Sequence, residues 1–212
     1  MALPQLALLT PMITAPDAFA SVLRAVLAAA PVAAVILDFG PEDGRDIGKA
    51  AKGLLPLVQG AGAAALIAAP GDPRLVARIG ADGAHYPLNH PVLADAIATL
   101  RPRSIVGVGA IRTRHDAMEA GELDIDYLMF GEPRADGFVP ETEKTAERAE
   151  WWASIFNTPA VATAGDLAAV PLLVATGAEF LGVGPWLFST PDPAATLAEV
   201  FRLAGAAKPS QG

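Results

Sequence analysis

The sequence contains no cysteine among its 212 residues, and it is poor in aromatic and in basic residues. The absence of cysteine excludes disulfides, thiolate metal ligands and cysteine nucleophiles. Aromatic residues make up 6%, and 23 Asp and Glu outnumber 15 Lys and Arg, which gives a formal net charge of −8. So acidic a chain, without a basic run, is a poor candidate for binding nucleic acid or an anionic membrane. It can still hold a phosphate, because backbone N–H groups and one or two basic side chains suffice locally.

Targeting and membrane-spanning segments are also missing. The first five residues form neither the basic nor the apolar region of a signal peptide. The Ala-rich apolar stretches are broken by Arg24, Pro31 or glycine well before the roughly 18 residues that a membrane span needs. We therefore expect a cytoplasmic protein with no membrane partner.

Apolar residues, mostly Ala, Val and Leu, make up 52% of the chain, which is typical of parallel strands buried on both faces. Short apolar runs predict strands at residues 6–10, 33–38, 64–68, 83–86, 104–108, 127–130, 160–163 and 180–183. The stretches after them predict helices at 16–30, 43–59, 72–79, 91–100, 113–121, 142–156, 166–176 and 194–203.

Strict alternation of strands and helices implies a parallel sheet. Eight units close a (β/α)₈ TIM barrel, whereas five or six would leave an open sheet. We predict an α/β fold with a single barrel domain over residues 1–205 and a disordered tail over 206–212. Acidic residues precede several strands, as at Asp82, Asp126 and Glu179. They lie at the stability face of a barrel, so we assign them no chemistry.

In a barrel, function collects at the C-terminal ends of the strands. His85 ends the fourth strand there, where it can act as a general acid or base, or can simply be a hydrogen-bonded structural residue. Asp38 and Glu132 end the second and sixth strands and complete the predicted catalytic set. The alternative for these two carboxylates is loop capping or an ion pair with an arginine of a neighbouring loop, namely Arg45, Arg112 or Arg134.

Small residues after the last two strands indicate a phosphate site made by the backbone. Ala164, Gly165 and Gly184 let the chain approach an anion closely. The alternative is an ordinary tight turn with Asp166 as a helix N-cap, whose carboxylate would compete for the same donors. Arg112, which follows strand five, is a basic side chain that can reach an anion.

The longest polar connection, residues 132–140, has the length of a lid over the barrel, with Phe138 as its apolar contact. Trp151 and Trp152 are neighbours on the helix that follows. Since adjacent helical residues point about 100° apart, one tryptophan should pack on the barrel and the other lie nearer solvent or the partner of a homodimer.

Several phrases of the chain occur together in one known family: residues 79–85 (IGADGAH), 105–109 (IVGVG), 126–133 (DYLMFGEP), 159–165 (PAVATAG) and 177–183 (GAEFLGV). With this order and spacing, residues 60–187 resemble the thiamine-phosphate synthase and thiazole tautomerase family, whose fold is also a (β/α)₈ barrel. The first 60 residues are similar only as alternating elements.

The resemblance implies a place in thiamine biosynthesis, a transferase or tautomerase activity, and a small phosphorylated heterocyclic ligand. The family's synthase joins a pyrimidine diphosphate to a thiazole phosphate with Mg²⁺ and releases pyrophosphate. The family's metal-binding Asn-Asp falls on Pro70-Gly71, so that Asp72, one residue later, is the remaining candidate for a metal ligand. The family's phosphate-binding lysine after strand six corresponds to Lys144.

Other reactive positions of the family are replaced. The basic Arg-x-Lys after strand two becomes Asp38-Phe39-Gly40, and the second magnesium carboxylate is lost in residues 87–90. The serine after strand five corresponds to Gly109, and the tautomerase histidine to Ile111. A diphosphate leaving group needs cations as its charge builds up, so these losses argue against synthase activity.

Three functions therefore stay open. The first is an enzyme of thiamine metabolism with a magnesium-dependent diphosphate site. The second is a non-catalytic or regulatory barrel with an apolar mouth, ringed by Tyr86, Phe130, Phe138 and Trp186. The third is a metal-free isomerase or lyase that uses His85 with Asp38 or Glu132.

Overall fold

The strands of the chain close into a parallel barrel. A computed structural model describes residues 3–40, 47–134 and 136–207. Its strands are β1 (Gln5–Leu9), β2 (Ala34–Leu37), β3 (Ala64–Ala68), β4 (Gly83–Pro87), β5 (Ile105–Ile111), β6 (Tyr127–Phe130), β7 (Ala160–Ala164) and β8 (Phe180–Val183). Each pairs in parallel with the next, and β8 pairs with β1. The predicted (β/α)₈ barrel is confirmed over the open sheet.

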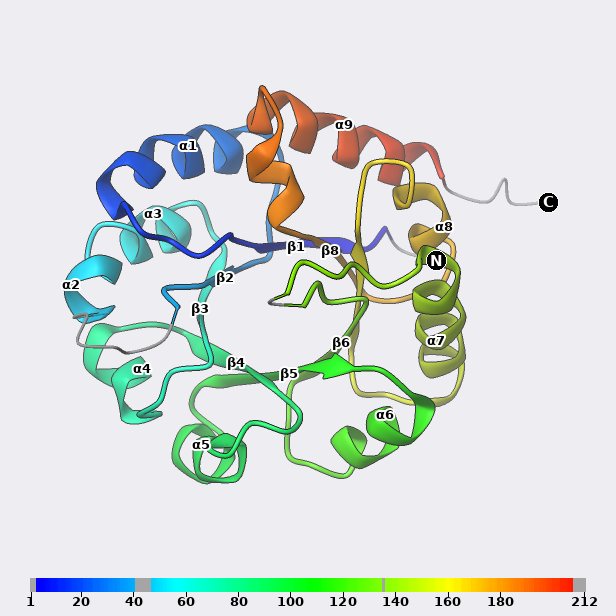
Figure 1. The fold of residues 1–212 in the computed structure, drawn as a ribbon, viewed down its shortest axis with the longest axis horizontal. Coiled ribbons are helices and arrows are strands. Elements are labelled where there is room, and N and C mark those ends of the chain that lie inside the picture. Colours follow the sequence, from blue (N-terminus) through cyan, green and yellow to red (C-terminus); the bar gives the residue numbers. More distant parts are fainter. Residues whose placement is uncertain (1–2, 41–46, 135, 208–212) are drawn as a thin grey trace.

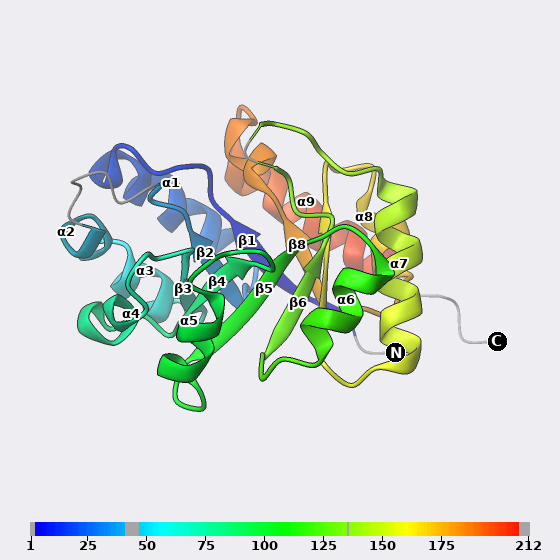
Figure 2. The same ribbon diagram turned by 60° about the horizontal axis from the view of Figure 1, so that its bottom comes forward.

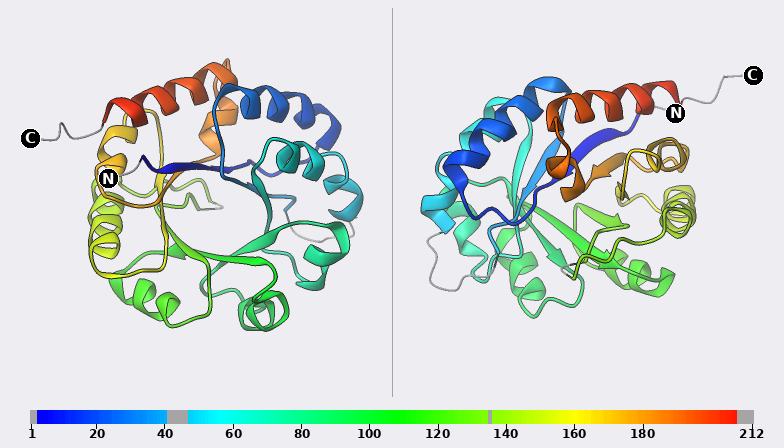
Figure 3. Two further views of the ribbon diagram at one scale, coloured as in Figure 1. Left: turned by 180° about the vertical axis from the view of Figure 1, so that it is seen from behind. Right: turned by 45° about the horizontal axis from the view of Figure 1, so that its top comes forward.

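Helices surround this barrel in a ring (Figure 1). They are α1 (Pro16–Ala29), α2 (Ile47–Ala51), α3 (Leu55–Gly60), α4 (Arg74–Ile79), α5 (Leu93–Leu100), α6 (Arg114–Gly121), α7 (Thr142–Ile155), α8 (Val170–Val174) and α9 (Pro193–Ala206), with a 3₁₀ helix η1 (Pro185–Ser189) before α9. Helix α9 packs beside α1 and so joins the two ends of the ring (Figure 3). Among the described helices, none has the length and apolar character needed to span a membrane.

Two predicted helices are wrong in extent. The stretch 43–59 holds two short helices, α2 and α3, and its first residues, 43–46, lie outside the described residues. Pro56 lies in the first turn of α3. Proline has no N–H with which to continue a preceding helix, so a new helix begins here. The stretch 166–176 is helical only over α8, which likewise has a proline, Pro171, in its first turn.

The predicted tail overlaps the end of α9, which continues through Ala206, and residues 208–212 lie outside the described part. The domain limits of 1–205 and 206–212 stay predictions.

Figure 2 shows the strands of the barrel surrounded by the ring of helices. Side chains fill the inside of the barrel. The interior cluster consists of Ala7, Leu9, Ile36, Leu66, Tyr127, Met129 and Val161. Tyr127 is the largest of these and needs a gap in the neighbouring strand, since a Cβ on Gly107 would overlap its ring. Gly107 is paired with Tyr127 in the sheet register, so the glycine makes room for the buried phenol.

The prediction for the tryptophan pair is confirmed. Trp152 is fully buried, stacks on Phe156 at 4.0 Å between ring centroids, and donates from Nε1 to the Thr158 carbonyl. Trp151 is half-buried, and the guanidinium of Arg114 lies 5.0 Å from its ring centre. One helix thus presents one tryptophan to the barrel and one to the outside.

The acidic residues before the strands repeat one structural device. Asp82 accepts a hydrogen bond from the amide of Ala65 in β3, Asp126 from that of Val106 in β5, and Glu179 from that of Ala160 in β7. Each carboxylate therefore binds the start of the strand that precedes its own, which agrees with a structural role for this face.

We expect Asp126→Ala to lower the free energy of unfolding by about 1–3 kcal/mol, because the fully buried amide of Val106 loses its acceptor. Urea denaturation measures this. Asp124→Ala is a matched control, since Asp124 also pairs with Arg101 but accepts no backbone amide, and its exposed ion pair is worth less than about 1 kcal/mol. An equal loss of free energy of unfolding in the two variants would contradict the structural role assigned to the Asp126 carboxylate.

Candidate functional site

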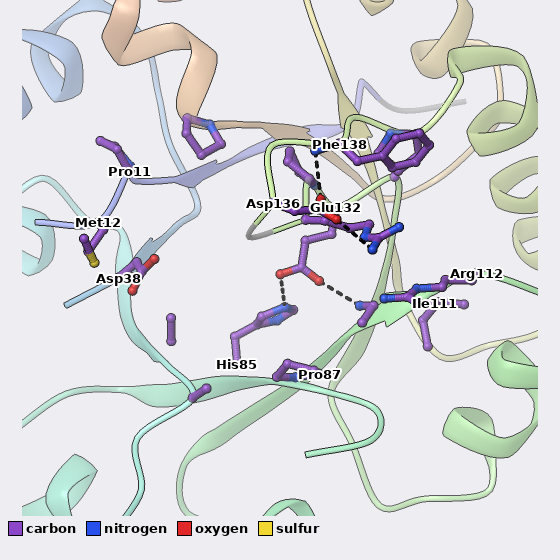
Figure 4. Close-up of a pocket in the computed structure, with 18 of the residues that line it drawn as sticks. Pro11, Met12, Asp38, His85, Pro87, Ile111, Arg112, Glu132, Asp136 and Phe138 are labelled. Carbon is purple, nitrogen blue, oxygen red and sulfur yellow. Dashed lines mark hydrogen bonds and ion pairs between the residues drawn. The ribbon is translucent and has the colours of Figure 1, made fainter. Parts of the chain in front are cut away.

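A cavity of about 1180 Å³ opens at the C-terminal ends of the strands. The three predicted catalytic residues, Asp38, His85 and Glu132, all line it (Figure 4). They come from β4 and from the loops that follow β2 and β6. The barrel topology thus brings together side chains that are far apart in the sequence.

His85 lies at the floor of this cavity with only 3% of its surface exposed. Its Nδ1 is 2.9 Å from the hydroxyl of Tyr127, which rises from the barrel interior. Its Nε2 is 3.4 Å from Oε1 of Glu132, an ion-pair distance too long for a good hydrogen bond. The imidazole is therefore fixed on one side and faces a carboxylate on the other.

Glu132 is held by a distorted segment of β5. Its Oε2 accepts a 2.7 Å hydrogen bond from the amide of Ala110. The pairing of β5 with β6 is irregular between Val108 and Ile111, and Ala110 has a φ of 57°, in the left-handed region that an alanine rarely adopts. Strain of this kind persists where the surrounding structure enforces it, often at functional sites.

Burial favours the neutral form of Glu132 and acts to raise the pKa of its carboxyl. The charge of the nearby His85, contact with that ring and the Ala110 amide outweigh burial, so the pKa of Glu132 is lowered from its usual value of 4.5. Glu132 is therefore a carboxylate near neutral pH.

Gly109 provides the space that this pair occupies. A Cβ at position 109 would overlap the carboxylate of Glu132 and would stand 2.5 Å from Nε2 of His85. Any larger residue would push the two groups away from their present positions.

Tyr127 is a functional candidate that the sequence reasoning missed. Burial, followed by the charges of Glu132 and Asp126, raises the pKa of its hydroxyl well above 10. The hydroxyl thus keeps its proton and lies within hydrogen-bond distance of Nδ1 of His85, which leaves Nε2 of the ring facing Glu132. Gly107, opposite Tyr127 in the register, was the available signal that an interior side chain here is large.

Asp38 lies across the mouth from Glu132 (Figure 4). It is half-buried, its Oδ1 accepts from the amide of Gly40 at 2.7 Å, and its own amide donates to Thr10 Oγ1. This matches the loop-capping alternative, and the residue also lines the cavity.

The alternative ion pairs with arginines do not form among the described residues. Arg134 pairs with Asp136 at 2.7 Å, and Arg112 has no ion pair within the part of the chain that the structure describes. Arg45 lies outside that part.

The predicted phosphate-binding residues divide into two groups. Arg112 and Lys144 line the cavity, whereas Ala164, Gly165 and Gly184 are not among its described lining residues. Asp166 accepts the amide of Ala169, as expected of the turn alternative.

Magnesium prefers several oxygen ligands, usually with one or two carboxylates. Asp72 does not fit such a site: its Oδ1 accepts the amide of Arg74, its Oδ2 lies 3.4 Å from Arg78, and it does not line the cavity. Within the described ranges, no three His, Asp or Glu side chains group as metal ligands do. Among the described residues, Asp72 is therefore not placed to act as a magnesium ligand at this cavity.

The expected apolar ring at the mouth is partly wrong. Tyr86 and Phe130 point outward and are fully buried between barrel and helices, where Tyr86 donates to the Pro70 carbonyl and Phe130 packs on Trp152. Phe138 does line the cavity, half-exposed, with the guanidinium of Arg134 5.5 Å from its ring centre.

Two further side chains need comment. Trp186, the last member of the expected ring, donates from Nε1 to the Ala164 carbonyl at 2.8 Å. His90 is half-buried and lines the cavity.

Comparison with known proteins agrees with this architecture. The family model described as thiamine monophosphate synthase matches residues 6–185. The thiamine-phosphate synthase of Rhodospirillum centenum is 36% identical over 202 residues, which cover 94% of this chain and 97% of that protein. The corresponding protein of Hyphomonas neptunium is 33% identical, covering 87% of this chain and 86% of its own length.

Solved structures share the fold at lower identity. Thiamine phosphate pyrophosphorylase from Pyrococcus furiosus superposes with a TM-score of 0.78 at 18% identity, covering 97% of each chain. The 3-hexulose-6-phosphate synthase from Salmonella typhimurium gives 0.74 at 16% identity, covering 96% of this chain and 100% of that one. The match over most of the sequence shows that this chain belongs to the thiamine monophosphate synthase family.

Proposed function

We propose that this protein binds a small phosphorylated heterocycle at the barrel mouth and transfers a proton of that ligand through Glu132 and His85, without a metal. The observation that carries the proposal is the pair formed by buried His85 and partly buried Glu132 at the floor of the cavity, 3.4 Å apart and bounded by Gly109. The family's substrates, as its resemblance implies, are phosphorylated heterocycles of a size that such a cavity accepts.

The proton transfer needs no outside reactant. Glu132 takes a proton from one atom of the bound ligand, and the bonding electrons stay in the ligand's conjugated system. A proton then returns to a second atom, either from Glu132 or from Nε2 of His85, which Glu132 in turn reprotonates. The net change is an isomerisation, and the Tyr127 hydroxyl holds the imidazole in the required orientation.

The synthase reaction is less well supported. A departing diphosphate needs a metal or several cations near its oxygens, and Asp72 is tied to Arg74 and Arg78 away from the cavity. A non-catalytic binding barrel is the second candidate, favoured by the 3.4 Å separation of His85 and Glu132, which exceeds the length of a good hydrogen bond. The cytoplasmic location and a homodimer stay predictions.

We expect thiazole phosphate or thiamine phosphate to raise the melting temperature with or without Mg²⁺. Binding to the native state alone stabilises it by about 2.7 kcal/mol at a ligand concentration of about 100 times Kd. Pyrophosphate with Mg²⁺ serves as the comparison, and a larger shift with it than with either heterocycle would favour the synthase. No shift with any of these compounds would remove the binding proposal.

Glu132→Gln and His85→Asn are expected to slow exchange of a ring hydrogen of bound thiazole phosphate with deuterium from D₂O, followed by NMR, by roughly 100-fold. Both variants should retain ligand binding. Since the pKa of Glu132 is lowered, the midpoint of the fall of the wild-type rate in acid should lie below pH 4.5. If the wild type shows no exchange above the rate of the free ligand, the non-catalytic candidate stands instead.

The lowered pKa of Glu132 also predicts how stability depends on pH. A carboxylate with a lower pKa in the folded than in the unfolded state stabilises the fold above the unfolded value. The advantage of wild type over Glu132→Gln should thus be complete above about pH 4.5 and shrink as the pH falls through the lower, folded pKa. Urea denaturation of both proteins at several pH values measures it, and a constant difference would refute the assignment.

A further inference from the structure

We infer that the anionic end of the ligand binds at Arg112 and Arg148, on the side of the mouth formed by β5 and α7, and not at the corner after β7 and β8. This inference rests on the proposed function, in that the ligand is phosphorylated. It moves the phosphate from the backbone of the last two loops to two arginine side chains.

The corner after β7 and β8 is covered by the loop that follows β6. A Cβ on Gly165 would stand 2.6 Å from Cγ1 of Val139, so the valine occupies the space above this glycine. Similarly, a Cβ on Gly184 would lie 3.4 Å from Cγ of Pro133. Figure 1 shows this loop reaching from β6 across the barrel before it enters α7. This loop therefore takes up space beside Gly165 that an anion at the usual phosphate corner would need.

Polar groups at this corner are also already engaged. The Trp186 indole donates to the carbonyl of Ala164, and the carboxylate of Asp166 holds the amide of Ala169. The charge of Asp166 would in addition repel a phosphate placed beside it.

Most of the charged side chains around the cavity form pairs. Arg134 is 2.7 Å from Asp136, and Lys144 is 2.9 Å from Glu141. Both of these cations and both of these carboxylates line the cavity. These pairs neutralise one another and leave little net charge for a ligand.

Arg112 and Arg148 are different. Both line the cavity, and neither has an ion pair with any residue in the described ranges. Glu147, the acidic neighbour of Arg148, is paired instead with Arg114 at 2.9 Å. Lys144 and Arg148 are four residues apart in α7 and therefore share one face of the helix.

Two guanidinium groups form a favourable site for a phosphate monoester. Each offers planar, forked N–H donors that match phosphate oxygens in pairs. Asp38 lies on the other side of the mouth, where its carboxylate suits an N–H or amino group on the ring. We therefore place the phosphate of the ligand at the two arginines and a hydrogen-bond donor of its ring at Asp38.

The test is a ³¹P NMR titration of the full-length protein with inorganic phosphate. Arg112→Met and Arg148→Met should each weaken phosphate binding by roughly tenfold, because each removes a charge-assisted contact. Arg103→Met is the matched control: this exposed arginine lies before β5, at the opposite end of the barrel, and its removal changes the net charge equally. Gly184→Ala, which adds bulk at the β7–β8 corner, should leave phosphate binding unchanged.

Two results would overturn the inference: binding that is lost in Gly184→Ala but kept in both arginine variants, or no binding of phosphate by the wild type. Loss in Arg103→Met equal to that in Arg148→Met would do the same, because it indicates attraction by overall charge. A different result would contradict the proposed function alone. In that case inorganic phosphate binds at the arginines, but neither heterocycle raises the melting temperature.

Discussion

A carboxylate placed inside a protein must find partners that replace water, and the site of this barrel is organised around that requirement. Glu132 obtains one partner from the Ala110 amide, at the cost of a left-handed alanine and an irregular β5, and the other from His85. The imidazole in turn needs the Tyr127 hydroxyl, which fits inside the barrel because of Gly107. Several local features of the floor thus follow from one partly buried charge.

This arrangement differs from the site that the family resemblance implies. By its resemblance, the family's synthase has a serine after strand five where this chain has Gly109, and the carboxylate of Glu132 takes up the space next to that glycine. The polar side chain at this point therefore follows β6 in this chain, whereas in the family's synthase it follows strand five. Meanwhile the cations after β2 are replaced by Asp38, which reverses the charge on that side of the mouth.

The sequence predicts the barrel well, because strict alternation of elements leaves few topologies, and the strand-end rule brings His85, Asp38 and Glu132 into one cavity. It fails where side-chain direction decides. Neighbours in a strand face opposite ways, so an inward His85 requires an outward Tyr86. The sequence also does not identify Tyr127 as a functional candidate, because tyrosine is common in protein cores. Only its contact with Nδ1 of His85 in the structure gives it a role.

Because the Glu132 carboxylate and a side chain at position 109 exclude each other in space, the two positions cannot change independently during evolution. A lineage that gained glutamate here must already have held glycine at 109, and a return to serine would first require a shorter residue at 132. Homologous sequences with this glutamate should therefore have glycine at 109, and those with a larger residue at 109 should lack the glutamate. Such correlated substitution would separate the members with this buried pair from the rest of the family before any of them is assayed.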